Sequence, residues 1–192
     1  MSTQLLFAAL VAALAIQRIY ELGLSRRNEK LMLAKGGREH ASQHYPVMKA
    51  VHTAWFISAL AEVVLFNRPF IPILSLVALL LLAAGQALRY AAIKTLGWRW
   101  SVRIVTIPDS PAVQLGIYRY LKHPNYMGVA LEILAMPLLH SAYITAIIFS
   151  IANGLILKVR IQAEEQALAE NNHYEEAFEH MPRFIPKIRE RI

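Results

Sequence analysis

Five apolar runs dominate the pattern of hydrophobic and polar positions along the chain. They cover residues 4–16 (extending to Tyr20), 48–66, 70–93, 126–139 and 142–157. A helix needs about 17–20 mostly apolar residues to cross the hydrocarbon core of a bilayer, and the fourth run falls short of that length. Only His140 and Ser141 separate the last two runs, so these two runs predict a short helical hairpin beside three longer spans.

This pattern predicts an all-α, polytopic integral membrane protein with about five transmembrane helices. The whole chain, residues 1–192, is expected to form a single membrane domain. Residues 1–93 would supply three N-terminal transmembrane helices and a cytoplasmic loop at 22–46. Residues 94–192 would supply a loop, the helical hairpin and a C-terminal cap. The polar segments are too long to be simple connectors, and long loops in compact proteins usually serve a function.

The composition agrees with a membrane environment. Apolar residues make up 56% of the chain and charged residues 17%, against about 45–50% and about 25% in soluble domains. The chain has no cysteine, which excludes disulfides and thiolate metal sites. Its histidines are scattered without the spacing of metal ligands, so no metal site is expected.

The distribution of basic residues predicts an orientation. In the five-span layout, every one of the 20 Lys and Arg residues except Arg68 falls on one face of the membrane. Cytoplasmic loops carry an excess of Lys and Arg. The N-terminus is therefore expected outside and the C-terminus in the cytoplasm, at the plasma or inner membrane if the source is bacterial. This topology accounts for the net charge of +7 without a nucleic-acid partner.

Two ionisable residues interrupt the second run, and such residues are functional candidates by default. They are His52 and Glu62. Glu62 is expected to pair with Arg89 or with Arg68, and a structural role is the favoured interpretation.

Residues 116–128, with the sequence GIYRYLKHPNYMG, are the most informative stretch. Pro124 suits the first turn of a helix, which places His123 near the N-cap. N–H groups at a helix N-terminus favour a carboxylate or phosphate. Gly128 lies one turn further on and allows a ligand or a second helix to approach the backbone closely. Taken alone, the stretch also fits an ordinary aromatic and basic entry to a membrane helix.

Two further motifs follow the predicted hairpin. Glu164 and Glu165 lie where the last apolar run continues out of the membrane, and the tail contains Tyr174, Phe178 and the sequence Arg183-Phe184-Ile185-Pro186. Each of these alone is explained by a solvated helix end or by an amphipathic segment with Pro stops.

In this order, the three motifs together resemble the isoprenylcysteine carboxyl methyltransferase family. The resemblance rests on Lys122-His123-Pro124-Asn125-Tyr126-Met127-Gly128, the Glu164-Glu165 pair and the tail motif, and it covers about residues 85–187. It implies an enzyme that uses S-adenosylmethionine to methylate an oxygen of a lipophilic small-molecule acceptor at the cytoplasmic interface, with the lipid bilayer as its surroundings. The oligomeric state stays open.

The resemblance also implies a set of site residues. Those expected to bind the cofactor are Tyr118, His123, Pro124, Tyr126, Gly128, Glu164 and Arg183. The helix N-terminus and His123 would meet the cofactor's carboxylate, and Glu164 or Glu165 its ammonium group or ribose hydroxyls. Tyr118 or Tyr126 would offer an aromatic face to the sulfonium or the adenine.

One departure from the family pattern bears on the acceptor. The family has Arg where this chain has Lys122, and a Lys point charge cannot copy the planar two-point grip of Arg on a carboxylate. The N-terminal half, with Gln17-Arg18-Ile19-Tyr20-Glu21-Leu22 and His44-Tyr45-Pro46, resembles a bacterial branch associated with type III polyketide synthases. That branch O-methylates alkylpyrones or alkylresorcinols.

A hydroxyl acceptor must lose a proton, so acid–base residues are expected near it. Glu132, Glu165 and His123 are the candidates, and Lys122 would stabilise the resulting oxyanion. Lys122 and Glu165 are the preferred catalytic pair, with Glu132 as a third candidate.

Two other functions remain open from sequence. A sterol-type membrane reductase would share a similar C-terminal arrangement but would use a nicotinamide cofactor. A non-enzymatic membrane scaffold subunit would leave His123, Glu164 and Glu165 facing solvent.

Overall fold

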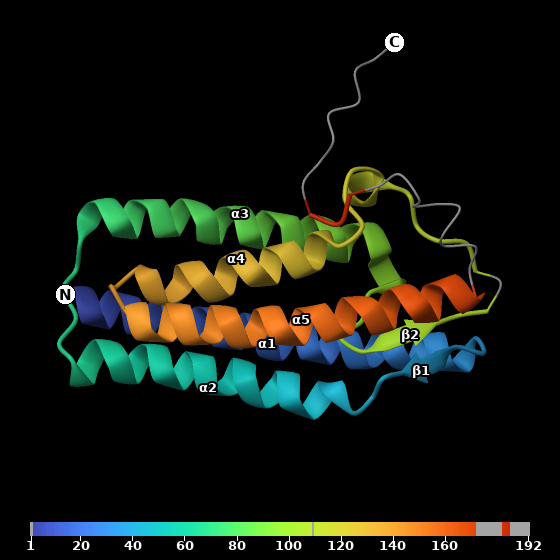
Figure 1. Cartoon of the computed structure of the whole chain (residues 1–192), viewed down its shortest axis with the longest axis horizontal. Helices are drawn as coiled ribbons and strands as arrows, with labels where there is room; N and C mark the ends of the chain where they lie inside the picture. The colour runs from blue at the N-terminus through green and yellow to red at the C-terminus, as the bar shows by residue number, and fades with distance from the viewer. Residues whose placement is uncertain (1, 109, 172–181, 185–192) are drawn as a thin grey trace, which may run out of the picture.

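Five α-helices and a small two-stranded ribbon make up the part of the chain that the computed structural model describes, residues 2–108, 110–171 and 182–184 (Figure 1). The elements follow in the order α1 (Thr3–Ala34), β1 (Arg38–His40), α2 (His44–Leu65), α3 (Pro72–Leu96), η1 (Gly97–Arg99), β2 (Ile104–Thr106), η2 (Gly116–Arg119), α4 (Pro124–Leu138) and α5 (Tyr143–Asn171).

The predicted helical membrane architecture is confirmed. Within the described residues, α1, α2, α3 and α5 are long and apolar enough to cross a membrane. Helix α4 has 15 residues, or roughly 22 Å at 1.5 Å per residue, and packs against α3 and α5. It forms the predicted hairpin with α5 but is too short to count as a full span.

Two expectations need correction. The fold is not purely helical, because β1 pairs antiparallel with β2, with Arg38 opposite Thr106 and His40 opposite Ile104. The expected loop at 22–46 is largely helix, since α1 continues to Ala34. Side-chain hydrogen bonds to the segment after α3 hold the extension of α1 in place. The Asn28 amide donates to the carbonyl oxygens of Gly97 and Trp100 at 3.1 and 2.8 Å.

The chain reverses at two opposite ends of the bundle. Figure 1 shows the N-terminus, the α2–α3 link and the α4–α5 link at one end, and the β1–β2 ribbon with the α3–α4 connection at the other. At the first end, the His140 ring hydrogen-bonds to Thr3 at 3.1 Å and lies between the rings of Phe7 and Phe70.

Glu62 supports the start of α5. Its carboxylate accepts the backbone N–H groups of Ile144 and Thr145 at 3.1 and 2.7 Å, and it pairs with Arg68 at 2.8 Å. The first N–H groups of a helix have no partner within the helix, so this buried carboxylate satisfies two of them. Of the two pairings expected from sequence, the structure has the one with Arg68.

Pro137 leaves a backbone carbonyl of α4 without its helical partner. A proline has no N–H, so the carbonyl of Ile133, four residues earlier, loses its helical partner. The indole N–H of Trp55 in α2 donates to that carbonyl at 3.1 Å. An aromatic residue from a neighbouring helix thus restores the bond that the proline removes.

Two glycines allow α3 and α4 to cross closely. A Cβ on Gly128 would lie 2.7 Å from the Gly85 oxygen and 2.6 Å from Arg89 Cγ, and a Cβ on Gly85 would lie 2.9 Å from the Gly128 oxygen. Small residues permit this kind of backbone approach between membrane helices.

A buried network of four charges joins α1, α3 and α4. Arg18 pairs with Glu21 and Glu132, and Arg89 pairs with Glu21 and lies 3.4 Å from Glu132. Gln17 extends the network by donating to Glu21 at 3.0 Å. Charged groups inside a membrane need partners of opposite charge, and two arginines facing two glutamates leave this network neutral. It sets the position of α4 relative to α1 and α3.

We expect Gly128→Ala to destabilise the protein by about 1–3 kcal/mol, the usual cost of overpacking a close contact. The matched control is Gly154→Ala in α5, where an added Cβ meets nothing within 4 Å. Thermal unfolding of both variants in detergent micelles measures the difference. Equal stability of the two variants would contradict the close crossing.

Removing one member of the buried network should cost far more than removing a surface charge. We expect Glu132→Ala to lower the free energy of unfolding by about 3–5 kcal/mol, because Arg18 and Arg89 lose a buried partner. Glu39→Ala, which breaks the more exposed pair with Arg103, should cost less than about 1 kcal/mol. Unfolding in a denaturing detergent series compares the two, and similar losses would argue against the network's role.

Candidate active site

The start of α4 meets the outward extension of α5 through a cluster of three side chains. His123 Nε2 lies 2.9 Å from Glu165 Oε1, and Arg183 donates to both oxygens of Glu165, at 2.9 and 2.5 Å. His123 is buried and stacks on Tyr126 with 5.5 Å between the ring centres. The two motifs that lie 42 positions apart in sequence are therefore in direct contact.

The described part of the tail also binds the backbone that precedes α4. The N–H of Lys122 donates to the carbonyl of Pro182 at 3.1 Å, and that of His123 donates to the carbonyl of Arg183 at 3.3 Å. These two N–H groups are thus directed at the protein's own tail. Tyr174 and Phe178, which belong to the tail motif, lie outside the described residues.

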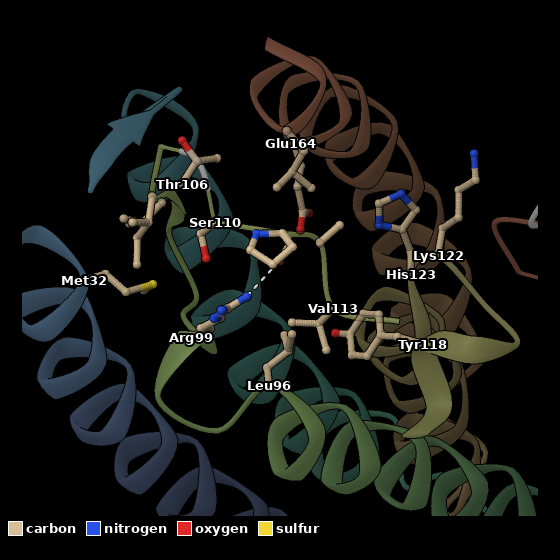
Figure 2. Close-up of a pocket in the computed structure, with 15 residues that line it drawn as sticks. Met32, Leu96, Arg99, Thr106, Ser110, Val113, Tyr118, Lys122, His123 and Glu164 are labelled. Carbon is tan, nitrogen blue, oxygen red and sulfur yellow. Dashed lines mark hydrogen bonds between the residues drawn. The ribbon is translucent and has the colours of Figure 1, made fainter. Parts of the chain in front are cut away.

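A cavity of about 130 Å³, which we call the cap cavity, lies at the end of the bundle that carries the ribbon (Figure 2). It lies between the end of α1, the α3–α4 connection and α5, and its polar lining is contributed by Arg99, Thr106, Ser110, Tyr118, Lys122, His123 and Glu164. Figure 2 shows Glu164, Ser110, Arg99 and Tyr118 converging on one space from different segments, whereas the Lys122 side chain extends away from Arg99 and Tyr118.

A second cavity, the membrane cavity, has a volume of about 470 Å³ and runs between the helices. Ligand pockets usually measure about 300–1,000 Å³ and have mostly apolar walls with a few polar groups. Apolar side chains form most of this wall, among them Ile19, Met48, Trp55, Phe56, Ile57, Val129, Ile133, Ile156 and Leu157. Ile19 of α1 and Ile57 of α2 are also exposed on the outer surface, at 69% and 63%. The cavity therefore extends to the lipid-facing side between α1 and α2.

The two cavities share a wall. Leu96, Tyr118, Lys122, His123 and Glu164 line both of them. We call this shared wall the junction. A cap compartment whose lining mixes polar and apolar side chains thus meets a largely apolar compartment among the helices. They meet at Leu96 and at four residues that the sequence motifs had singled out.

The predicted site residues divide into those that line a cavity and those that support the lining. Tyr118, Lys122, His123 and Glu164 line both cavities, and Tyr126 and Glu132 line the membrane cavity. Pro124, Gly128, Glu165 and Arg183 belong to neither lining. Pro124 starts α4, Gly128 packs against Gly85, and Glu165 and Arg183 bind His123 and each other.

Several lining residues were missed from sequence. Arg160 was counted among the basic residues on one face of the membrane, yet it is buried, donates to the carbonyl of Val102 at 2.6 Å and lies 5.9 Å from the Tyr126 ring. The missed residues of α5 lie on the same face of the helix as Glu164. Residues that line the cavity recur on this face at positions 153, 156, 157, 160 and 164. This spacing was visible in the sequence. Arg99 and Ser110 in the α3–α4 connection had no comparable signal.

Glu164 has capacity left for a ligand. Its Oε2 atom is buried and has no hydrogen-bond partner among the described residues, while the carboxylate also interacts with the Tyr126 hydroxyl. A buried, unpaired carboxylate oxygen is costly, and Glu164 lines both cavities. The site therefore fits a ligand that carries an ammonium group or hydroxyls, as S-adenosylmethionine does.

Comparisons with known proteins indicate a family for the chain. Residues 76–170 match the isoprenylcysteine carboxyl methyltransferase (ICMT) family. The uncharacterised protein YpbQ of Bacillus subtilis is 41% identical over 166 residues, covering 86% of this chain and 98% of that protein. An uncharacterised protein of Haemophilus influenzae is 29% identical over 79% of this chain and 88% of that protein.

More distant relatives have a known activity. The protein-S-isoprenylcysteine O-methyltransferase of Schizosaccharomyces pombe is 30% identical over 58% of this chain and 49% of that protein. The solved structure of a eukaryotic intramembrane Ras methyltransferase, ICMT, superimposes with a TM-score of 0.62 at 22% identity, over 74% of this chain and 53% of that one. This chain spans about half the length of these two proteins, and the solved structure supports the fold alone.

The family match favours a methyltransferase over a nicotinamide-dependent reductase. The chain belongs to the isoprenylcysteine carboxyl methyltransferase family, a family of membrane methyltransferases.

Proposed function

We propose that the protein is an S-adenosylmethionine-dependent methyltransferase that methylates an oxygen of a lipid-dissolved acceptor at the membrane interface. The single observation that carries this proposal is the junction. A cap cavity with several polar side chains in its lining and a larger, mostly apolar cavity among the membrane helices share Tyr118, Lys122, His123 and Glu164. A water-soluble methyl donor and a lipophilic acceptor need this combination of compartments.

The cofactor would occupy the cap cavity and extend across the junction into the membrane cavity, because about 130 Å³ is less than the usual volume of a ligand pocket, about 300–1,000 Å³. The unpaired Glu164 oxygen accepts its ammonium group or ribose hydroxyls, and Arg99 offers a positive charge for its carboxylate. Tyr118 presents a ring to the adenine or sulfonium. When bound, the cofactor supplies an electrophilic methyl group.

Glu165 and Arg183 would act from behind this wall. They touch His123 and each other rather than the cavity. By holding the His123 ring they fix the lining at the start of α4. We therefore assign them a positioning role, and the same holds for Pro124 and Gly128.

The membrane cavity would hold the acceptor. Each buried CH₂ of an alkyl chain contributes about 0.8 kcal/mol, so a chain that enters from the bilayer between α1 and α2 favours this apolar wall. The protein then contributes mainly alignment, because methyl transfer requires acceptor oxygen, methyl carbon and sulfur in line. Lys122 borders the junction, but its side chain extends away from Arg99 and Tyr118 (Figure 2), so its ammonium group would have to turn toward the acceptor to stabilise the developing oxyanion.

We further propose that the acceptor carries a ring hydroxyl, as in alkylpyrones or phenolic lipids, rather than an isoprenylcysteine carboxylate. Support comes from Lys122, which replaces the Arg of the family motif and lacks its two-point grip on a carboxylate. The basic residues outside the helix interiors support a cytoplasmic placement of the cap and the C-terminus, with the N-terminus outside.

We expect Glu164→Gln to weaken S-adenosylmethionine binding at least about tenfold, or roughly 1.4 kcal/mol. The amide removes the charge that the unpaired oxygen offers to the ligand's ammonium group. Calorimetric titration of purified protein in detergent measures the dissociation constant, with Glu170→Gln on the exposed part of α5 as the control. Binding of NADPH but not of S-adenosylmethionine would favour a reductase, and binding of neither would favour a scaffold subunit.

The apolar cavity gives a separate test of the acceptor side. We expect Val129→Trp, which fills the cavity, to raise KM for a long-chain acceptor at least about tenfold and to leave the dissociation constant for S-adenosylmethionine unchanged. Leu134→Trp, on the outward face of the same helix at 37% exposure, is the matched control. Transfer of a labelled methyl group to lipid extracts, followed by mass spectrometry, provides the assay. An unchanged KM in Val129→Trp would place the acceptor elsewhere.

A further inference from the structure

His52 is a basic group in the wall of the membrane cavity that neither the family motifs nor the proposed roles above use. It lies on α2 among the apolar side chains of that wall. Its Nδ1 atom lies 2.8 Å from the carbonyl oxygen of Met48. A carbonyl only accepts hydrogen bonds, so Nδ1 carries the hydrogen in the neutral ring and Nε2 holds the lone pair. The helix backbone thereby selects one tautomer of His52.

The other candidate proton acceptors are already engaged. Glu165 binds His123 and Arg183 and lines neither cavity. Glu132 pairs with Arg18 and Arg89, and His123 Nε2 faces Glu165. Each would have to give up an ion pair or a hydrogen bond before it could take a proton.

Glu164 has an oxygen without a partner among the described residues, but Glu164 also lines the cap cavity. In the proposed function the cofactor's ammonium group binds this oxygen there. The Nε2 lone pair of His52 makes no hydrogen bond among the described residues, so it can take up a proton without first breaking an ion pair. His52 is thus the group in the described wall that is best suited to receive a proton.

Arginines from three helices line the membrane cavity together with His52. Arg18 of α1, Arg89 of α3 and Arg160 of α5 lie near enough for their charges to act on the ring. Arg160 contacts the Tyr126 ring, and Arg89 reaches Asn125 at 3.4 Å. Both Asn125 and Tyr126 belong to the first turn of α4, directly after His123. On α4 itself, Glu132 faces the same cavity.

We propose that His52 is the general base that accepts the proton of the acceptor hydroxyl during methyl transfer; this inference rests on the proposed function. The acceptor O–H bond breaks and its proton goes to Nε2 of His52. The oxygen lone pair forms the new bond to the methyl carbon as the carbon–sulfur bond breaks and its electron pair stays on sulfur. The products are a methyl ether, a neutral thioether and a protonated His52 ring, which releases its proton to water after the ether leaves.

The test uses His52→Gln, which keeps a polar side chain of similar reach but cannot take up the proton. With a long-chain alkylphenol, whose pKa is about 10 as for Tyr, kcat at pH 7 should fall at least about a hundredfold. With the corresponding nitro-substituted alkylphenol, which is already ionised near neutral pH, kcat should change less than about threefold. The loss with the plain phenol should shrink as the pH rises toward that phenol's own pKa, because the acceptor then ionises without a base. His44→Gln, on the same helix but in neither cavity lining, is the matched control.

A second variant separates catalysis from folding. Added imidazole should restore turnover of the plain alkylphenol by His52→Ala, and calorimetric binding of S-adenosylmethionine should stay within about twofold of wild type in both variants. Equal losses with both phenols at every pH, or no loss at all, would overturn the role of His52 while leaving the methyltransferase proposal intact. Absence of cofactor binding by the wild-type protein would overturn the proposed function and this inference together.

Discussion

The fold depends on the pairing of four charged side chains inside a helical bundle that lies in lipid. Arg18, Glu21, Arg89 and Glu132 form a neutral network that joins α1, α3 and α4. Breaking such a network leaves a buried charge without a partner, which is costly. The network, with the glycine crossing of α3 and α4, therefore holds the short helix α4 in place. Because α4 begins at Pro124, its position also determines where His123 and Tyr126 lie.

The position of α4 determines the arrangement of the site. His123 meets Glu165 of α5, and Arg183 of the tail completes the cluster. Glu164, one residue earlier on α5, lines both cavities and keeps one oxygen without a partner among the described residues. The supporting residues thus hold the junction from outside. The junction faces a cap compartment with several polar side chains on one side and a mostly apolar compartment on the other. A reaction between a water-soluble donor and a lipid requires that division.

Much of this arrangement follows from local sequence patterns. Apolar runs predict the helices and the short hairpin, and the motifs at 122–128 and 164–165 predict that two distant segments contribute to one site. The α1 extension was missed because polar residues suggested a loop, while its helix is stabilised by contacts such as Asn28 with the α3–α4 connection. Arg18, Arg89 and Arg160 were counted as basic residues at the membrane face, since single-residue counting does not reveal pairing across helices. The burial of Arg89 and Arg160 and the ion pairs of Arg18 depend on tertiary contacts that no local pattern encodes.

In the proposed mechanism, the cap cavity and the membrane cavity form one chamber with the reacting atoms at the junction. The most direct test of this mechanism is an experimental structure of the protein in lipid nanodiscs with S-adenosylhomocysteine and a long-chain phenol bound. We predict the cofactor sulfur beside His123 and Glu164, the adenosine in the cap cavity and the alkyl chain between α1 and α2. Cofactor density away from the junction, or an acceptor chain that does not enter the membrane cavity, would contradict the account.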